Sequence, residues 1–182
     1  MDQEHIYDLI IIGAGPAGLS AGIYAGRATL DTLILEADTV GGQVTTTSIV
    51  YNYPAAPAID GTKLANQMQK QAADFGVTIK RDGVQEVQLD GEIKVITTKS
   101  GHQYQARSVV VATGAHPRKV GFKGEDEFRG RGVAYCSTCD GELFSGLQVF
   151  VVGGGYAAAE EADYLTRYAK HVTVLVRGDH FS

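Results

Sequence analysis

The two cysteines of the chain, Cys136 and Cys139, are separated by two residues and followed directly by Asp140. Thiols at this spacing can close a small disulfide ring, but such a ring crosslinks too little chain to stabilise the fold much. Chemistry is the better explanation, because thiol–disulfide exchange needs an attacking thiolate, a second thiol that resolves the mixed disulfide, and a proton source. Asp140 can be that acid or base, or it can form a turn with Gly141, since Asp-Gly is a common turn pair.

A zinc site is a weaker explanation of the same cysteines. Structural zinc takes about four ligands, and the sequence has neither a second C-x-x-C nor a nearby pair of histidines. We therefore predict no metal site, unless two chains share an ion.

The composition indicates a globular protein that binds small molecules or other proteins. The 182 residues are 44% hydrophobic and 20% charged, which is ordinary for such proteins. The net charge of -5 argues against nucleic acid or an anionic membrane as the main partner. Because the start of the chain lacks a secretion signal and no apolar run approaches the length of a membrane span, we expect a cytoplasmic location, where thiols are kept reduced.

A glycine-rich turn of the form G-x-G-x-x-G lies between an apolar strand and a helix near the start of the chain. Its first glycine allows a tight turn, the second lets a pyrophosphate approach the backbone, and the third lets helix and strand pack closely. The start of the helix favours anions, and an acid at the end of the next strand can accept ribose hydroxyls. This pattern predicts a dinucleotide-binding βαβ unit with Gly13, Gly15, Pro16, Ala17, Gly18 and Glu36 at the cofactor.

A second βαβ pattern follows later in the chain, with a G-x-G-x-x-A turn between another apolar strand and helix. At its ribose position stands Val176, which cannot bind a diol, and the neighbouring Arg177 can either face a 2′-phosphate, as in NADP recognition, or lie on the surface. We predict a nucleotide site formed by Gly153, Gly155, Ala158 and Arg177.

The remaining elements follow from periodicity and turn signals. We expect the first helix to bury Ala17, Ala21, Tyr24, Ala25 and Ala28. A second helix over 60–75 should bury Leu64, Met68, Ala72 and Phe75, with Gly76 as its stop. Residues 77–112 predict an antiparallel meander that returns to a buried strand at 109–112. The charge run 125–127 is interpreted as a solvated loop.

Six motifs in this order carry a family resemblance: GAGPAGLSAGIYAGRA, GGQ at 41–43, NYP at 52–54, VVVATGA at 109–115, GRGVAYCSTCDG and VVGGG. The sequence closely resembles the low-molecular-weight thioredoxin reductases and related flavoprotein disulfide reductases over essentially its whole length. The resemblance implies an α/β fold, with an FAD-binding Rossmann-like (three-layer) domain and its antiparallel β-meander at 1–116. The start of a second Rossmann-like, nicotinamide-binding domain, which carries the C-x-x-C, is expected at 117–182.

The resemblance also implies roles for individual residues. The first glycine turn and Glu36 would hold the FAD diphosphate and adenosine, and further residues would line the flavin: Gly41, Gly42, Gln43, Asn52, Ala112, Thr113 and Gly114. Cys139 would face the flavin, Cys136 would attack a protein disulfide, and Asp140 would donate the proton. Electrons would pass from NADPH through FAD to the dithiol and on to a thioredoxin-like protein, in a full-length form that is a homodimer.

Two features of the sequence leave alternatives open. NADPH-binding members of the family carry four basic residues where this chain has Val176, Arg177, Gly178 and Ser182, so NADH, ferredoxin or another donor could replace NADPH. The family's chain continues beyond the position of Ser182, so we expect the sequence to be an N-terminal portion. A non-catalytic FAD-binding fragment is the remaining alternative.

Overall fold

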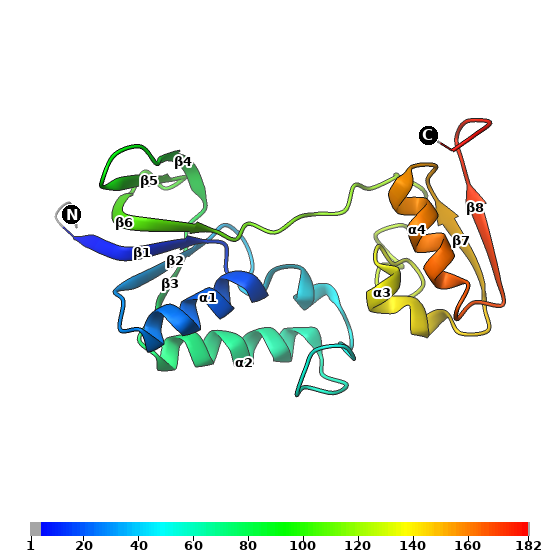
Figure 1. Cartoon of the computed structure of the whole chain (residues 1–182), viewed down its shortest axis with the longest axis horizontal. Helices are drawn as coiled ribbons and strands as arrows, with labels where there is room; N and C mark the ends of the chain where they lie inside the picture. Colours follow the sequence, from blue (N-terminus) through cyan, green and yellow to red (C-terminus); the bar gives the residue numbers. More distant parts are fainter. Residues whose placement is uncertain (1–4, 182) are drawn as a thin grey trace. The chain divides into compact units, whose positions relative to one another are not determined.

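The computed structural model describes residues 5–181, and the chain divides into two compact units, Met1–His116 and Pro117–Ser182 (Figure 1). Each unit is described by itself. Among residues 5–181 we find no helix with the length and apolar character that a membrane crossing requires. That each unit binds a cofactor stays a prediction.

The first unit is a six-stranded mixed sheet with two helices. Its strands lie in the order β3-β2-β1-β6-β5-β4, with β1 parallel to both β2 and β6, and with β4, β5 and β6 antiparallel. The elements are β1 (Ile6–Ile12), α1 (Pro16–Arg27), β2 (Thr32–Glu36), the 3-10 helix η1 (Gly42–Thr46), α2 (Gly61–Asp74), β3 (Thr78–Arg81), β4 (Val84–Gln88), β5 (Lys94–Thr98) and β6 (Gln103–Val111).

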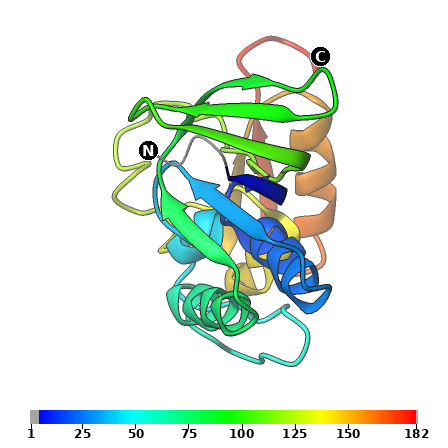
Figure 2. The same cartoon turned by 90° about the vertical axis from the view of Figure 1, so that its left-hand side faces the viewer.

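Three layers follow from the alternation of side chains along β1 and β2. Successive residues of a strand point to opposite faces, so Ile11 packs on the side of α1 and α2, whereas Ile10 packs with Ile96 and Tyr104 of the meander. Figure 2 shows the two helices on one side of β1, β2 and β3, and the β4–β6 strands on the other. The predicted α/β fold with a meander is confirmed.

Helix α1 buries only part of the predicted face: Ala25 is buried and Ala21 packs against the core, whereas the other three predicted residues are exposed. Its buried residues are Gly18, Leu19, Gly22 and Ala25, whereas Tyr24 is 74% exposed and Ala17 and Ala28 are also exposed. The reason is close packing: a Cβ atom at Gly22 would lie 2.8 Å from Cδ1 of Ile34. Glycines, which a hydrophobicity pattern does not count as core residues, therefore form the contact surface with the sheet.

Helix α2 follows the prediction closely. The Asp60 side chain caps its start by accepting from the Lys63 N–H at 2.8 Å. Leu64, Met68 and Ala72 are buried, and Gly76, with a φ of +84°, ends the helical segment. The prediction for Phe75 was wrong, because this residue follows the last helical residue and stays partly exposed beside Arg27.

Two strand predictions need correction. Residues 78–81 form β3, which pairs in parallel with β2 instead of joining the meander, because α2 carries the chain back to the outer edge of β2. The end of β6 is not a buried strand, since Val111 is 65% exposed. The meander cluster contacts β6 chiefly at Tyr104 and Ala106, in the first half of this strand.

The second unit contains one short βαβ unit preceded by a loop. Its elements are α3 (Ser137–Asp140), the 3-10 helix η2 (Gly141–Phe144), β7 (Gln148–Val152), α4 (Tyr156–Leu165) and β8 (His171–Leu175). Strands β7 and β8 pair in parallel, and α4 lies along one face of them (Figure 1). Ala162 and Leu165 are buried on α4, whereas Ala158 and, beyond the end of the helix, Ala169 are half-buried. Phe150, on the face of β7 away from α4, is 61% exposed.

Candidate cofactor and dithiol sites

The first glycine turn is held by backbone contacts that only glycine permits. Gly13 has a φ of +105°, and a Cβ atom on it would lie 2.3 Å from the carbonyl oxygen of Ala112. A Cβ atom on Gly18 would lie 1.9 Å from the carbonyl oxygen of Gly13. The turn, the end of β6 and the first turn of α1 therefore pack directly against one another through backbone atoms.

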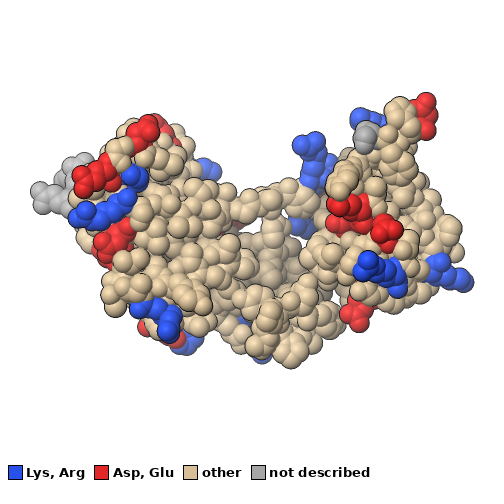
Figure 3. Space-filling view, in the orientation of Figure 1, with Lys and Arg blue, Asp and Glu red and all other residues tan. Residues whose placement is uncertain are grey.

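An open approach to the start of α1 lies beside this packing. Apart from Gly15 itself and its chain neighbours, no atom lies within 4 Å of a Cβ position at this glycine, and no side-chain hydrogen bond caps this end of the helix. Figure 3 shows no charged side chain over this end of α1 on the face in view. Backbone N–H groups at such a helix start favour phosphate, so the residues present fit the diphosphate of a dinucleotide.

The segment that follows β2 closes over the turn. The N–H of Gly41 donates to the carbonyl oxygen of Ala14 at 2.7 Å. A Cβ atom on Gly42 would lie 3.3 Å from Cα of Gly15. Gln43 continues this segment in η1 and is half-buried. The predicted GGQ residues thus lie next to the predicted phosphate-binding glycine.

Glu36 lies at the end of β2 and binds the glycine turn itself. Its Oε2 accepts a hydrogen bond from the Ala14 N–H at 2.7 Å, and its Oε1 accepts from the Asp38 N–H at 2.9 Å. Each carboxylate oxygen can accept a second hydrogen bond. The carboxylate can therefore hold the turn in place and still accept a ribose hydroxyl.

The end of β6 completes this edge of the sheet. Ala112 donates its N–H to the carbonyl oxygen of Ile12 at 2.8 Å, and Gly114 has a φ of +68°. A Cβ atom on Gly13 would lie 3.2 Å from Cα of Thr113. Because the chain leaves β1 for β2 on one side while β6 lies on the other, this is a switch point where α/β sheets bind ligands.

Asn52 is the predicted flavin residue that the structure does not tie to this edge. It is exposed in the segment between η1 and α2, and within residues 5–181 no hydrogen bond joins it to the glycine turn. The cofactor roles of all these residues stay predictions.

The second glycine turn has the same order of residues but different packing. Gly153 has a φ of +146°, and a Cβ atom on Gly154 would lie 2.4 Å from Cγ1 of Val176. No side chain caps the start of α4. Arg177 is exposed after β8, so both the 2′-phosphate role and the surface role of this side chain stay open to test.

The two cysteines form a disulfide at the start of α3. Cys136 precedes the first residue of α3 and is half-buried, and its Sγ lies 3.3 Å from Oγ1 of Thr138. Cys139 is exposed. The disulfide thus joins the residue before α3 to a residue of this short helix, which fits a redox-active disulfide.

Asp140 ends α3 directly after Cys139, and Gly141 begins η2. The Asp140 side chain is half-buried, and burial raises its pKa because the charged form loses solvation. A carboxyl group with a raised pKa exchanges protons more readily near neutral pH. The same residue ends a helix, so its structural role and its proposed chemical role are compatible.

Glu125 is a polar residue that the sequence interpretation missed. The charge run 125–127 was predicted to be a solvated loop, and for Glu125 this was wrong, because the residue is 4% exposed. Its Oε1 accepts from the Val120 N–H at 3.0 Å and from the Tyr135 hydroxyl at 2.8 Å, and its Oε2 accepts from the Gly121 N–H at 2.6 Å. The glycine at 121, whose φ of +91° marks a turn, was the available hint that this loop folds on itself.

Glu161 is the second missed residue. It lies on α4, and its Oε2 accepts a hydrogen bond from the N–H of Ser137, the first residue of α3. Ser137 is buried. No local pattern signals this contact, since the partners are far apart in sequence. Within residues 5–181, no three His, Cys, Asp or Glu side chains gather as a metal site.

Comparison with known proteins gives consistent matches. A family model described as pyridine nucleotide-disulphide oxidoreductase matches residues 7–182. The thioredoxin reductase of Peptoclostridium acidaminophilum is 48% identical over 97% of this chain and 56% of that protein; that of Bacillus subtilis is 46% identical over 98% and 56%. The crystal structure of thioredoxin reductase from Streptococcus pyogenes matches with a TM-score of 0.92 at 42% identity, covering 97% of this chain and 57% of that chain. The chain spans about half the length of the curated relatives it matches.

Proposed function

The chain belongs to the pyridine nucleotide-disulphide oxidoreductase family, and from this premise we propose that it forms the flavin-binding and dithiol-bearing part of a thioredoxin-disulfide reductase. The family implies a flavin and a nicotinamide nucleotide; we propose FAD in the first unit and NADPH in the second. The observation that carries the proposal is the Cys136–Cys139 disulfide followed by the half-buried carboxyl group of Asp140.

The first unit supplies the residues for FAD. The open approach at Gly15 and the start of α1 would hold the diphosphate, and Glu36 would accept a ribose hydroxyl. Residues 41–43, Asn52 and residues 112–114 would line the flavin. When bound, FAD would supply the two-electron chemistry that links a nicotinamide to a disulfide.

The dithiol then acts by thiol–disulfide exchange. The thiolate of Cys136 attacks one sulfur of the acceptor's disulfide, so that one acceptor sulfur leaves as a thiolate and a mixed disulfide forms. Asp140 gives the leaving sulfur its proton. Cys139 attacks the Cys136 sulfur of the mixed disulfide, and the proton of its thiol passes to the second acceptor sulfur. This step releases the reduced acceptor and restores the Cys136–Cys139 bond. The acceptor gains two electrons and two protons in total.

The electron donor is the part of the proposal with a second candidate. NADPH would bind the second glycine turn, with Arg177 facing its 2′-phosphate. Val176, whose side chain contacts Gly154, lies where a ribose-binding acid would lie and offers no acceptor to the diol of NADH. Arg177 is the one basic residue among positions 176, 177, 178 and 182, so NADH and reduced ferredoxin stay the alternatives to NADPH that the experiment must include.

The biological setting completes the proposal. The acceptor is a thioredoxin-like protein, as the names of the relatives suggest. We place the reaction in the cytoplasm and propose a homodimer as the full-length form. An exposed disulfide cycle suits a compartment where thiols are kept reduced.

The test uses the purified full-length protein under anaerobic conditions. We expect it to bind FAD, to lose the yellow colour of oxidised flavin when NADPH is added, and then to reduce a thioredoxin disulfide. Cys136→Ser and Cys139→Ser should each keep FAD binding and lose thioredoxin reduction, which separates the dithiol from the flavin site.

Each other outcome has a defined meaning. Bleaching only by NADH or by reduced ferredoxin replaces the donor and leaves the dithiol role intact. Absence of flavin binding contradicts the FAD site. Full thioredoxin reduction by either serine variant contradicts the exchange mechanism.

A further inference from the structure

We propose that Glu125 and Glu161 are positioning residues that hold the chain on the two sides of Cys136 and thereby favour the disulfide over the dithiol. The inference rests on the proposed redox role of Cys136 and Cys139. It adds two carboxylates from distant parts of the second unit, neither of which contacts the sulfurs in the hydrogen bonds described above.

The first of the two carboxylates, Glu125, acts through Tyr135, the residue directly before Cys136. Hydrogen bonds from the Val120 N–H, and then from Gly121 and Tyr135, hold the pKa of Glu125 below its ordinary value. The hydrogen bond to Glu125 raises the pKa of the Tyr135 hydroxyl. At neutral pH the pair is therefore a charged acceptor and a protonated donor, and hydrogen bonds of this kind are stronger than neutral ones.

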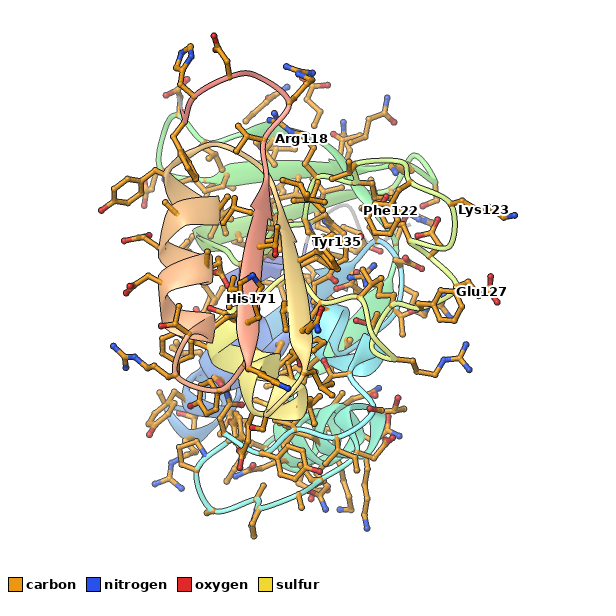
Figure 4. The ribbon with its side chains drawn as sticks, turned by 90° about the vertical axis from the view of Figure 1, so that its right-hand side faces the viewer. Arg118, Phe122, Lys123, Glu127, Tyr135 and His171 are labelled. Carbon is orange, nitrogen blue, oxygen red and sulfur yellow. A yellow bond between two sulfur atoms is a disulfide. The ribbon has the colours of Figure 1, made fainter. Side chains whose placement is uncertain are left out.

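The ring of Tyr135 is also fixed. The Arg129 guanidinium carbon lies 5.4 Å from the centre of this ring, within the range of a cation–π contact. The loop that carries Arg129 is closed by the Val133 N–H, which donates to the carbonyl oxygen of Phe128 at 2.9 Å. In Figure 4 the side chains of Lys123 and Glu127, which belong to the same loop, point outward, whereas the side chain of Tyr135 does not.

The second carboxylate, Glu161, acts through Ser137, the residue directly after Cys136. Its N–H donates to Oε2 of Glu161. Glu161 lies on α4 next to Ala162, which is buried, and its own side chain is half-buried. Cys136 therefore lies between two residues that are each held by a carboxylate of the second unit.

This arrangement should affect the balance between disulfide and dithiol. A disulfide forms more readily when the two sulfurs stay close after reduction, because less freedom is lost on closing the ring. Loosening Cys136 on either side raises the freedom of the dithiol and so eases reduction. Loss of the Glu161 charge acts in the same direction, because a nearby negative charge disfavours the thiolate form of the reduced protein.

The experiment is a redox titration of the full chain in glutathione buffers, without flavin, nucleotide or thioredoxin. Two glutathione thiols supply two electrons and two protons, the Cys136–Cys139 bond breaks, and one glutathione disulfide forms. Alkylation and mass spectrometry count the free thiols at each ratio. We expect Tyr135→Phe and Glu161→Ala each to shift the equilibrium about threefold to tenfold toward the dithiol, a tenfold shift being about 30 mV.

Matched variants separate positioning from general damage. Glu127→Gln, in the same loop as Glu125, and Glu160→Gln, next to Glu161 on α4, change exposed carboxylates and should stay within about twofold of the wild type. Glu161→Gln keeps an oxygen that can accept the Ser137 N–H, so it should fall between Glu161→Ala and the wild type. Alkylation of reduced Cys136 at fixed pH should be faster in Glu161→Ala and unchanged in Tyr135→Phe.

The inference is overturned if Tyr135→Phe and Glu161→Ala both keep the native circular dichroism spectrum and titrate like the wild type, or shift toward the disulfide. Should Glu161→Ala fail to fold, the result with Tyr135→Phe decides. Because the titration needs no flavin or acceptor, the expected shift can be found even if the proposed reductase activity fails, and the two outcomes stay distinct.

Discussion

The two glycine turns have the same order of strand, turn, helix and strand, yet they are packed in different ways. In the first unit Gly18 lets α1 touch the backbone of Gly13, where a Cβ atom would lie 1.9 Å from a carbonyl oxygen. In the second unit the same position is Ala158, whose Cβ lies 3.1 Å from a Cβ position at Gly153. The first helix therefore lies closer to its strand than the second.

A second difference concerns the residue inside each turn and the residue at the end of the following strand. In the first unit Ala14 donates its N–H to the carboxylate of Glu36. In the second unit Gly154 lies under the side chain of Val176. These positions change together: an acid at the strand end accepts from the turn, whereas a β-branched residue there requires a glycine below it. A sequence fingerprint for such a βαβ unit should therefore include the residue at the end of the second strand as well as the glycines of the turn.

The largest expected effect comes from adding one methyl group to the closer packed turn. Gly18→Ala should lower the free energy of unfolding of the first unit by about 3 kcal/mol, because the new Cβ overlaps backbone atoms that cannot rotate away. The reverse change in the second unit, Ala158→Gly, should cost only about 1 kcal/mol, the difference in helix propensity. Urea denaturation followed by hydrogen exchange in each unit measures both values, and equal costs would contradict the proposed difference in packing.

An intermediate effect is expected where Gly154 contacts Val176. Gly154→Ala should destabilise the second unit by about 2 kcal/mol through overlap with the valine side chain. Val176→Ala removes the overlapping atoms, so the double variant should be more stable than the sum of the two single changes predicts. Additive costs in this double-mutant cycle would show that the two positions are independent.

The smallest effect is expected from acid acting on a buried carboxylate of the second unit, Glu125. The folded pKa of Glu125 lies below its ordinary value of 4.5, chiefly because of the hydrogen bond from the Val120 N–H, with Lys119 contributing. Its stabilisation is therefore complete above about pH 4.5 and is lost as the pH falls through the lower folded value. Urea titrations at stepped pH should show this loss in the wild type and a flatter profile in Glu125→Gln. A profile that Glu125→Gln leaves unchanged would assign the acid sensitivity to other groups.

Much of the fold was predictable because its signals are local. The glycine turns, the apolar strands between them and the Asp60 cap of α2 depend on residues close together in sequence. The face that α1 buries was not predictable from its apolar spacing, because Gly18 and Gly22 contact the sheet through their lack of side chains. The pairing of β3 depended on the path of α2, which periodicity does not describe.

The residues of the dithiol site likewise include some that local sequence spacing identifies and others that it does not. Cys136, Cys139 and Asp140 were singled out as candidates from their spacing, and the two cysteines form a disulfide, whereas the chemical roles of the three residues stay predictions. Glu161 was not recognised because its partner Ser137 lies 24 positions away in sequence. Glu125 was not recognised because its partners, ten positions away or fewer, meet it only when the loop folds. A carboxylate in a charge run becomes a buried acceptor only when the loop around it folds, so its role depends on tertiary structure.

The β7–β8 pair has a practical consequence for handling the protein. In the described chain neither outer edge of this pair has a further strand, and Phe150 and Val152 are exposed on its surface. Unpaired strand edges beside apolar side chains are templates for intermolecular pairing and aggregation. Solutions of this polypeptide should accordingly turn cloudy with rising concentration, and a lysine in place of Phe150 should keep them clear for longer.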